Sequence, residues 1–275
     1  MPDDQVLLTT PTPWGVRLTM NRPAKLNAIS HDLRVALDAA IAAAAQDPGV
    51  RVIAIAGAGR AFSSGYDLSE EQPGDTWSWR RILAEDVAST LAIWRCPKPV
   101  IAQVHGYALA GGLELAMACD LIVAAEGSQL GEPEIRFGSA PVTLLMPYLI
   151  GQKMTRELLL TGDLIDAERA ERIGLVNRVV ALDRLEAEVD ALADRLARVP
   201  EDVMAPTKAM LNRAMEAAGF LEAVESGLDL QSIVNMSETS RAFDAIVRRD
   251  GLKAALAWRD ERYDERLAGK DPGRS

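Results

Sequence analysis

The stretch that decides the fold is HGYALAGGLELAMACD, residues 105–120. It follows an apolar run, Val100–Val104, which predicts a buried strand. The glycines let the backbone turn without steric cost. From about Gly111 the spacing of the apolar residues becomes helical. The stretch therefore predicts a strand, a glycine turn and a helix in succession.

Two features of this turn suit carbonyl chemistry. The start of a helix presents backbone N–H groups that have no partner within the helix, and these groups suit a negative oxygen. One carboxylate, Glu114, lies in an otherwise apolar turn. Donors for an oxyanion beside a lone acid are what carbonyl chemistry requires. An acid placed near a helix N-terminus for the sake of the helix dipole explains Glu114 equally well, so from this window alone both interpretations stay open.

Composition limits the class of protein. A chain of 275 residues predicts one large domain, or one domain with an appendage. With 48% hydrophobic and 25% charged residues it resembles an ordinary globular protein. The net charge of −10 disfavours a nucleic-acid partner. No run of about 18 apolar residues occurs, so no membrane span is expected. The two cysteines, Cys96 and Cys119, lack CxxC spacing, and no secretory signal is visible, which favours a reduced, cytoplasmic setting.

Strand and helix signals alternate over roughly the first two-thirds of the chain. The expected strands are Val6–Thr10, Val16–Met20, Val50–Ala56, Val100–Val104, Leu121–Ala125 and Val176–Val180. The expected helices run from the N-cap Ser30 to about Gln46, over Ile82–Arg95, from Gly111, and over Leu144–Leu149, Thr155–Leu160 and Ala167–Ile173. Residues 69–79 and 126–141 are expected to be loops. From Leu182 onward helices are expected, with breaks near Pro200, Gly219 and Gly251, and the tail from Gly269 is expected to fray. This order predicts an α/β fold in which helices cover a sheet.

Several motifs that suggest a functional site are explained by ordinary structural roles. Gly57-Ala58-Gly59 follows a strand, but Phe62 stands where a dinucleotide-binding fingerprint needs its third glycine. Ser63 and Ser64 lack the nucleophile elbow that a serine hydrolase would need. His105 is expected to pack or to bond to backbone, and Asp67 is expected to cap a local turn.

Glu132 and Glu134 flank Pro133 in an expected loop. Two acids about one water apart can act as base and acid on that water. Glu134 can form such a pair with Glu114 if its loop reaches the cleft that holds Glu114.

The motifs, taken in order, resemble those of the crotonase, or enoyl-CoA hydratase/isomerase, superfamily. They are Asn21–Ala28, Gly57–Leu68, Gly106–Asp120, Glu132–Gly138 and Thr161–Val180. The similarity extends from about residue 6 to about residue 263. It implies an α/β crotonase (ClpP-like) fold. In that fold a spiral of β-β-α units with the active site, residues 1–198, precedes a helical C-terminal trimerisation region, residues 199–275.

The resemblance also implies a function and a set of site residues. It implies an enoyl-CoA hydratase that acts on acyl-CoA thioesters as a homotrimer or a dimer of trimers, without a metal or other cofactor. The backbone N–H groups of Tyr66 and Gly111 would form the oxyanion hole, and Glu114 and Glu134 would be the two acids. The residues at positions that usually hold the CoA moiety are Lys25, Leu26, Ser64, Asp67, Leu68, Phe243 and Lys253.

Two departures from the family pattern leave other reactions open. Val142-Thr143-Leu144 follows Pro141, where family hydratases usually carry a glycine-rich run, and Glu132 replaces what is often glutamine. An enoyl-CoA isomerase, a hydrolase or a decarboxylase on the same oxyanion hole therefore remains an alternative, as does a non-catalytic acyl-CoA-binding protein.

Overall fold

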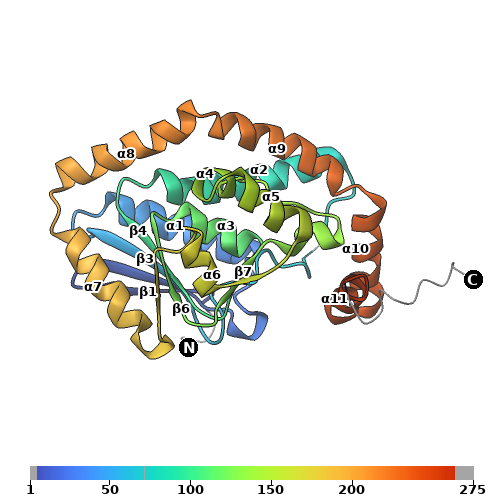
Figure 1. Cartoon of the computed structure of the whole chain (residues 1–275), viewed down its shortest axis with the longest axis horizontal. Coiled ribbons are helices and arrows are strands. Elements are labelled where there is room, and N and C mark those ends of the chain that lie inside the picture. The colour runs from blue at the N-terminus through green and yellow to red at the C-terminus, as the bar shows by residue number, and fades with distance from the viewer. Residues whose placement is uncertain (1–4, 71, 264–275) are drawn as a thin grey trace, which may run out of the picture.

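Two β-sheets wound into a spiral form the centre of the molecule, and helices cover them (Figure 1). The computed structural model describes residues 5–70 and 72–263. The tail from Gly269, which was expected to fray, lies outside these residues. The proposed division of the chain at residues 198 and 199 stays a prediction.

Within the described residues, the larger sheet has six strands in the order β1-β2-β3-β4-β6-β9. They are β1 (Leu7–Thr12), β2 (Gly15–Met20), β3 (Val52–Gly57), β4 (Val100–Val104), β6 (Leu121–Ala125) and β9 (Arg178–Val180). The β1–β2 pair is antiparallel and the other pairs are parallel. A smaller sheet contains β5 (Tyr107–Leu109), β7 (Gln129–Gly131) and β8 (Ile165–Asp166). Strands β4 and β6 of the larger sheet are each followed in the chain by a short strand of the smaller sheet, β5 and β7, as a β-β-α spiral requires.

The helices occupy the positions between and after these strands. They are η2 (Pro23–Lys25), α1 (His31–Gln46), α2 (Thr76–Arg95), α3 (Gly111–Ala118), η3 (Pro133–Phe137), α4 (Met146–Leu149), α5 (Gln152–Thr161), α6 (Ala167–Arg172), η4 (Leu182–Arg184), α7 (Leu185–Ala197), α8 (Glu201–Ala217), α9 (Phe220–Val234), α10 (Glu238–Asp250) and α11 (Leu252–Glu261). The expected start of α1 is confirmed, because the Ser30 hydroxyl accepts a hydrogen bond from Leu33 N at 3.3 Å.

Alternating side chains of the larger sheet fill two separate cores. Ile53 and Ile55 of β3 face the main core with α1, α2 and α3, whereas Val52 and Ala54 face α7. This two-residue alternation is what a strand buried on both faces requires. Helices α8 and α9 then arch over the top of the molecule and lead to α10 and α11 at its far end (Figure 1).

Three expectations about element boundaries are wrong. Helix α2 begins at Thr76 rather than Ile82, because the Asp75 carboxylate caps it by accepting from Trp77 N and Ser78 N. The expected loop 126–141 contains β7 and η3, which are too short to give a periodic signal. An additional helix break separates α9 from α10, where the Ser237 hydroxyl caps α10.

Candidate active site

Two turns from different spiral layers lie side by side at the start of α3. Ser63 N donates to Tyr107 O at 3.0 Å, and Leu109 N donates to Ser63 O at 3.0 Å. A Cβ atom added to Gly65 would lie only 3.3 Å from Gly111 N. Residues 63–66 and 107–111 are therefore in direct backbone contact.

Within the described part of the chain, the backbone N–H groups of Tyr66 and Gly111 have no hydrogen-bond partner. Two adjacent amides are paired, since Asp67 N donates to Ile29 O at 3.0 Å and Ala110 N donates to Gly131 O at 2.9 Å. Two unpaired donors on adjoining turns form the kind of site that stabilises an oxyanion.

The turn before α3 holds a strained residue. Ala110 has φ 55° and ψ −134°, a conformation that glycine adopts freely and an L-residue rarely does. Gly111 follows at the first position of the helix and approaches the Tyr66 ring so closely that an added Cβ would lie 2.4 Å from Tyr66 Cε2. The turn thus brings the Gly111 amide under the Tyr66 side chain, and only glycine permits this approach.

Glu114 lies in the first turn of α3 and is only 5% exposed. Its Oε1 accepts hydrogen bonds from Val142 N at 2.9 Å and Thr143 N at 2.8 Å. Burial raises the pKa of Glu114, and the two backbone bonds oppose that rise because they favour the ionised form. The segment that replaces the usual glycine-rich run therefore still supplies backbone donors to this acid. In this segment the next residue, Leu144, has φ 46°, a left-handed backbone conformation.

Glu134 enters the same site from η3 and is 8% exposed. Burial raises the pKa of Glu134 to about 8, and the charge of Glu114 adds to this rise. Its Oε2 has no hydrogen-bond partner among the described residues. The two acids therefore differ in their hydrogen bonding, since Glu114 Oε1 accepts two backbone bonds and Glu134 Oε2 accepts none. Two carboxyls in different environments are typical of an acid and base pair.

Glu132 is a third buried carboxyl in this region and is 1% exposed. Burial raises the pKa of Glu132 well above its ordinary value, with further contributions from Glu114 and Glu134. The sequence placed this residue in the same loop as Glu134 and marked it as a departure from the family pattern.

Three of the residues expected to hold CoA lie together. Ser64 N donates to Leu26 O at 3.0 Å, and the Ser64 hydroxyl donates to Lys25 O at 3.4 Å. Asp67 caps its local turn as expected, accepting from Ser69 N at 3.1 Å. Burial alone would raise the pKa of Asp67, but hydrogen bonds from Ser69 and Arg22 lower it below its ordinary value.

The C-terminal residues expected to contact CoA differ in exposure. Phe243 of α10 is 2% exposed and stacks on Phe137 of η3 with ring centroids 4.8 Å apart. Leu68 packs against the same apolar cluster. Lys253 is exposed on α11. The structure thus brings Leu68 and Phe243 together, and a contact of Phe243 or Lys253 with CoA stays a prediction.

Asn27 is a site-building residue to which sequence reasoning assigned no role. Its side chain accepts from Arg22 N at 2.9 Å and donates to Ala58 O at 2.9 Å and Ala61 O at 2.7 Å. It also adopts φ 53°, which asparagine tolerates better than most residues. The sequence signal that could have identified Asn27 was its place in the Asn21–Ala28 motif.

The serine and histidine explanations are confirmed. The Ser63 hydroxyl donates to Asn27 O at 2.9 Å and accepts from Gly65 N at 3.2 Å. His105 Nε2 lies 2.9 Å from Gly59 O. These contacts account for both side chains as structural elements.

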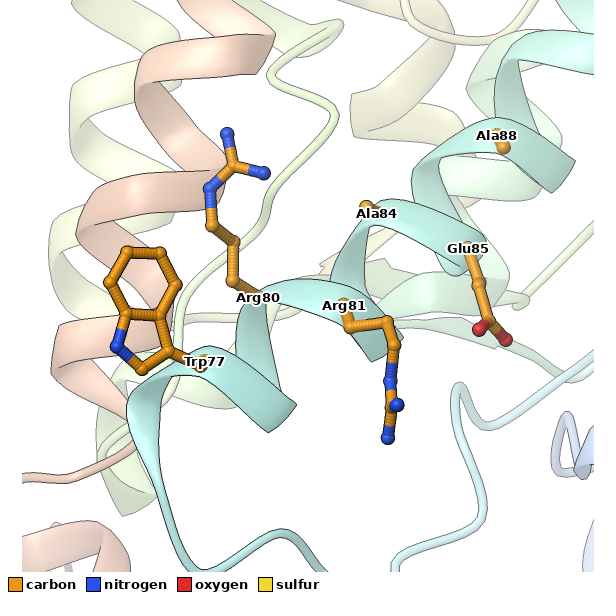
Figure 2. A pocket seen from close by; sticks show the side chains of 6 residues that line it. All are labelled: Trp77, Arg80, Arg81, Ala84, Glu85 and Ala88. Carbon is orange, nitrogen blue, oxygen red and sulfur yellow. The ribbon is translucent and has the colours of Figure 1, made fainter.

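A groove of about 530 Å³ lies on the outer face of α2, away from the paired acids. Figure 2 shows that its lining side chains all come from this one helix. Trp77 is 82% exposed at one end of the groove, and Arg80 bonds to Asp229 of α9 at 2.6 Å. None of the expected site residues lines this groove.

No described helix is both long and apolar enough to cross a bilayer.

Comparison with known proteins reveals one consistent similarity. Residues 16–248 match the family model described as enoyl-CoA hydratase/isomerase. A probable enoyl-CoA hydratase of Rhizobium meliloti is 39% identical over 202 residues, which cover 72% of this chain and 78% of that protein. A crotonyl-CoA hydratase of Syntrophomonas wolfei is 37% identical over 203 residues, with coverage of 72% and 78%. The crystal structure of an enoyl-CoA hydratase/isomerase from Xanthobacter autotrophicus Py2 superposes with a TM-score of 0.91 at 41% identity, covering 94% of this chain and 98% of that chain.

Proposed function

Because the chain belongs to the enoyl-CoA hydratase/isomerase family, we propose that it adds water across the 2,3 double bond of an enoyl-CoA thioester. The product is a 3-hydroxyacyl-CoA. The observation that carries this proposal is the pair Glu114 and Glu134, two buried carboxyls of one site in which the charge of Glu114 raises the pKa of Glu134. The hydratase names of the relatives agree with it.

The thioester carbonyl would accept hydrogen bonds from the backbone N–H groups of Tyr66 and Gly111. As the hydroxyl adds, negative charge develops on this oxygen, and the two donors stabilise the enolate-like form. One donor of this kind is typically worth about 3 kcal/mol of the barrier. Only backbone atoms take part, so a tyrosine at position 66 is compatible with this role.

Glu114 and Glu134 would divide the proton transfers between them. The Glu114 carboxylate takes a proton from water, and the water oxygen forms a bond to the β-carbon. The double-bond electrons move to the α-carbon, which takes the proton of neutral Glu134. A proton then returns from Glu114 to Glu134 and completes the cycle. The proposed reaction uses protein groups and water, without a metal or redox cofactor.

The test follows the loss of enoyl-CoA absorbance with crotonyl-CoA and longer substrates. The Glu114→Gln and Glu134→Gln variants are each expected to lose about 10²-fold or more in kcat, the usual contribution of a positioned acid or base. Exposed Glu126 provides a matched control, and Glu126→Gln is expected to keep full activity. Full activity in both site variants would contradict the proposal. Mass spectrometry identifies the reaction, since hydration adds one water, isomerisation leaves the mass unchanged and hydrolysis releases free CoA.

We also propose a homotrimer, or a dimer of trimers. Support comes from apolar side chains left exposed on α8 and α9. Val203, Met210, Leu211, Leu230 and Ile233 are 53–66% exposed. Exposed apolar surface of this kind marks an interaction site. Sedimentation should give a mass three or six times 29.7 kDa, and a monomer at micromolar concentration would contradict the proposal.

A reduced, cytoplasmic setting is supported by Cys96 and Cys119, which are both free and buried.

A further inference from the structure

A short segment after η3, from Ser139 to Thr143, connects the two acids of the site. At its start, Ser139 N donates to Glu134 O at 3.0 Å. At its end, the backbone N–H groups of Val142 and Thr143 donate to Glu114 Oε1 at 2.9 and 2.8 Å. The position of this segment therefore affects how Glu134 and Glu114 lie relative to each other.

Gln231 of α9 holds this segment from outside the acid pair. Its side chain is buried, and its Nε2 donates to the Ser139 hydroxyl and to Asn235 Oδ1, both at 2.6 Å. Among the described residues, the segment has no other hydrogen-bond partner apart from Glu134 and Glu114. In the described part of the chain, Gln231 is thus the one further side chain that ties the segment to the body of the protein by a hydrogen bond.

The same face of α9 contacts the other end of the segment. Gly227 lies one turn before Gln231, and positions four apart share a helix face. A Cβ added to Gly227 would lie 3.0 Å from Val142 O. At the turn before the segment, Gly138 has φ 89° and lies so close to α10 that an added Cβ would be 2.5 Å from Ser240 N. Helices α9 and α10 therefore pack against this part of the site, and Gln231 adds a directional bond to that packing.

Packing alone does not account for a glutamine at this position. Oε1 of Gln231 is buried and has no hydrogen-bond partner among the described residues. A buried polar oxygen without a partner lowers stability, whereas an apolar side chain of the same size would avoid that cost. The amide is therefore explained by its two N–H groups, which bond to Ser139 and Asn235.

We propose that Gln231 is a positioning residue whose amide holds Ser139 and thereby keeps Glu134 in place opposite Glu114. The effect passes through the backbone, because the Ser139 amide is bonded to the Glu134 carbonyl. Gln231 need not touch the substrate for this role. The inference rests on the proposed hydratase reaction, in which the two acids act at adjacent carbons of one substrate.

Gln231→Met keeps the length of the side chain and removes both donors. Small displacements of a reacting group cost large factors in rate, so kcat should fall about tenfold. The KM and the dissociation constant of an unreactive acyl-CoA analogue should change less than about twofold, because the oxyanion donors stay in place. Ser139→Ala removes the acceptor and should have the same effect. Gln46→Met is the matched control, since Gln46 is exposed on α1, and it should keep full activity.

The double variant separates one shared bond from two independent effects. If Gln231 acts through Ser139, Gln231→Met combined with Ser139→Ala should be about as slow as either single variant. Losses that multiply would overturn the proposal, as would an unchanged kcat in Gln231→Met. A rise in KM as large as the fall in kcat would show general disruption of the site and would also overturn it. Thermal unfolding verifies that the variants fold, and Ser139→Ala carries the test if Gln231→Met does not fold.

Amide hydrogen exchange tests the tether without any need for turnover. The N–H groups of Ser139, Val142 and Thr143 should exchange about tenfold faster in Gln231→Met than in the wild type. Those of β4 should exchange at the wild-type rate. Equal exchange of the three N–H groups in both proteins would overturn the inference. If the wild type does not hydrate enoyl-CoA but these groups exchange faster in the variant, the proposed function fails while the tether by Gln231 stands.

Discussion

Replacing Gly111 with alanine should disable the oxyanion site through the Tyr66 ring. The new Cβ would lie 2.4 Å from Tyr66 Cε2 and 2.6 Å from Cδ2, distances that no Cβ contact sustains. The ring must therefore move, and because Tyr66 is packed against the core, we expect its backbone amide to be displaced as well. Displacing one oxyanion donor costs about 3 kcal/mol, so kcat should fall about 100-fold.

The assay is hydration of crotonyl-CoA by Gly111→Ala, Tyr66→Ala and the double variant. Tyr66→Ala keeps both backbone donors and should lose less than about tenfold in kcat, on the same scale of barriers. In the double variant the clash is gone, so its kcat should lie close to that of Tyr66→Ala. Gly74→Ala is the matched control, because an added Cβ at Gly74 meets nothing within 4 Å.

Two results would refute this reasoning. If the double variant is as slow as Gly111→Ala, the ring is not the cause of the loss. If Gly111→Ala retains the activity of Gly74→Ala, the Tyr66 ring yields to the new Cβ without displacing either oxyanion donor. Thermal unfolding curves for all four variants separate these outcomes from misfolding.

Three more perturbations test neighbouring parts of the site. The kcat/KM should fall as pH rises above about 8, because Glu134 loses its acid form there. Since burial raises this pKa from 4.5, the contribution of Glu134 to the free energy of unfolding is greatest below about pH 4.5 and is lost as the pH rises toward 8. Glu134→Gln should remove that part of the pH dependence in urea titrations, and an unchanged pH dependence would contradict this. Ala110→Gly should raise the free energy of unfolding by about 1 kcal/mol by relieving the strain at φ 55°, and a loss of stability in denaturant would contradict this. Gly227→Val should lower kcat about tenfold. A Cβ added at Gly227 would lie 3.0 Å from Val142 O, so the larger valine side chain should displace the loop whose backbone N–H groups bond to Glu114. Unchanged kinetics would show that this loop moves without loss of activity.

The glycine-bearing turns and their role could be predicted because the chemistry resides in the backbone. Residues 100–120 carry a strand, a turn and a helix start in one continuous pattern, and the structure has all three as β4, the turn before α3, and α3. Glu114 stands out as the one charged residue of an apolar helix. These signals are local, so the sequence alone displays them.

The rest of the site depends on contacts between segments that are distant in sequence. The three-residue strand β7 exists because β5 pairs with it, and neither shows a periodic signal. Val142 and Thr143 bond Glu114 through backbone atoms, a role that side-chain identity does not reveal. The raised pKa values of Glu132 and Glu134 follow from burial by the surrounding packing, which composition and spacing do not report.

A crystal structure with an unreactive acyl-CoA analogue tests the central claim most directly. The account expects the thioester oxygen to lie about 2.7–3.1 Å from both the Tyr66 and the Gly111 backbone nitrogen. A carbonyl oxygen bound away from either nitrogen would contradict it.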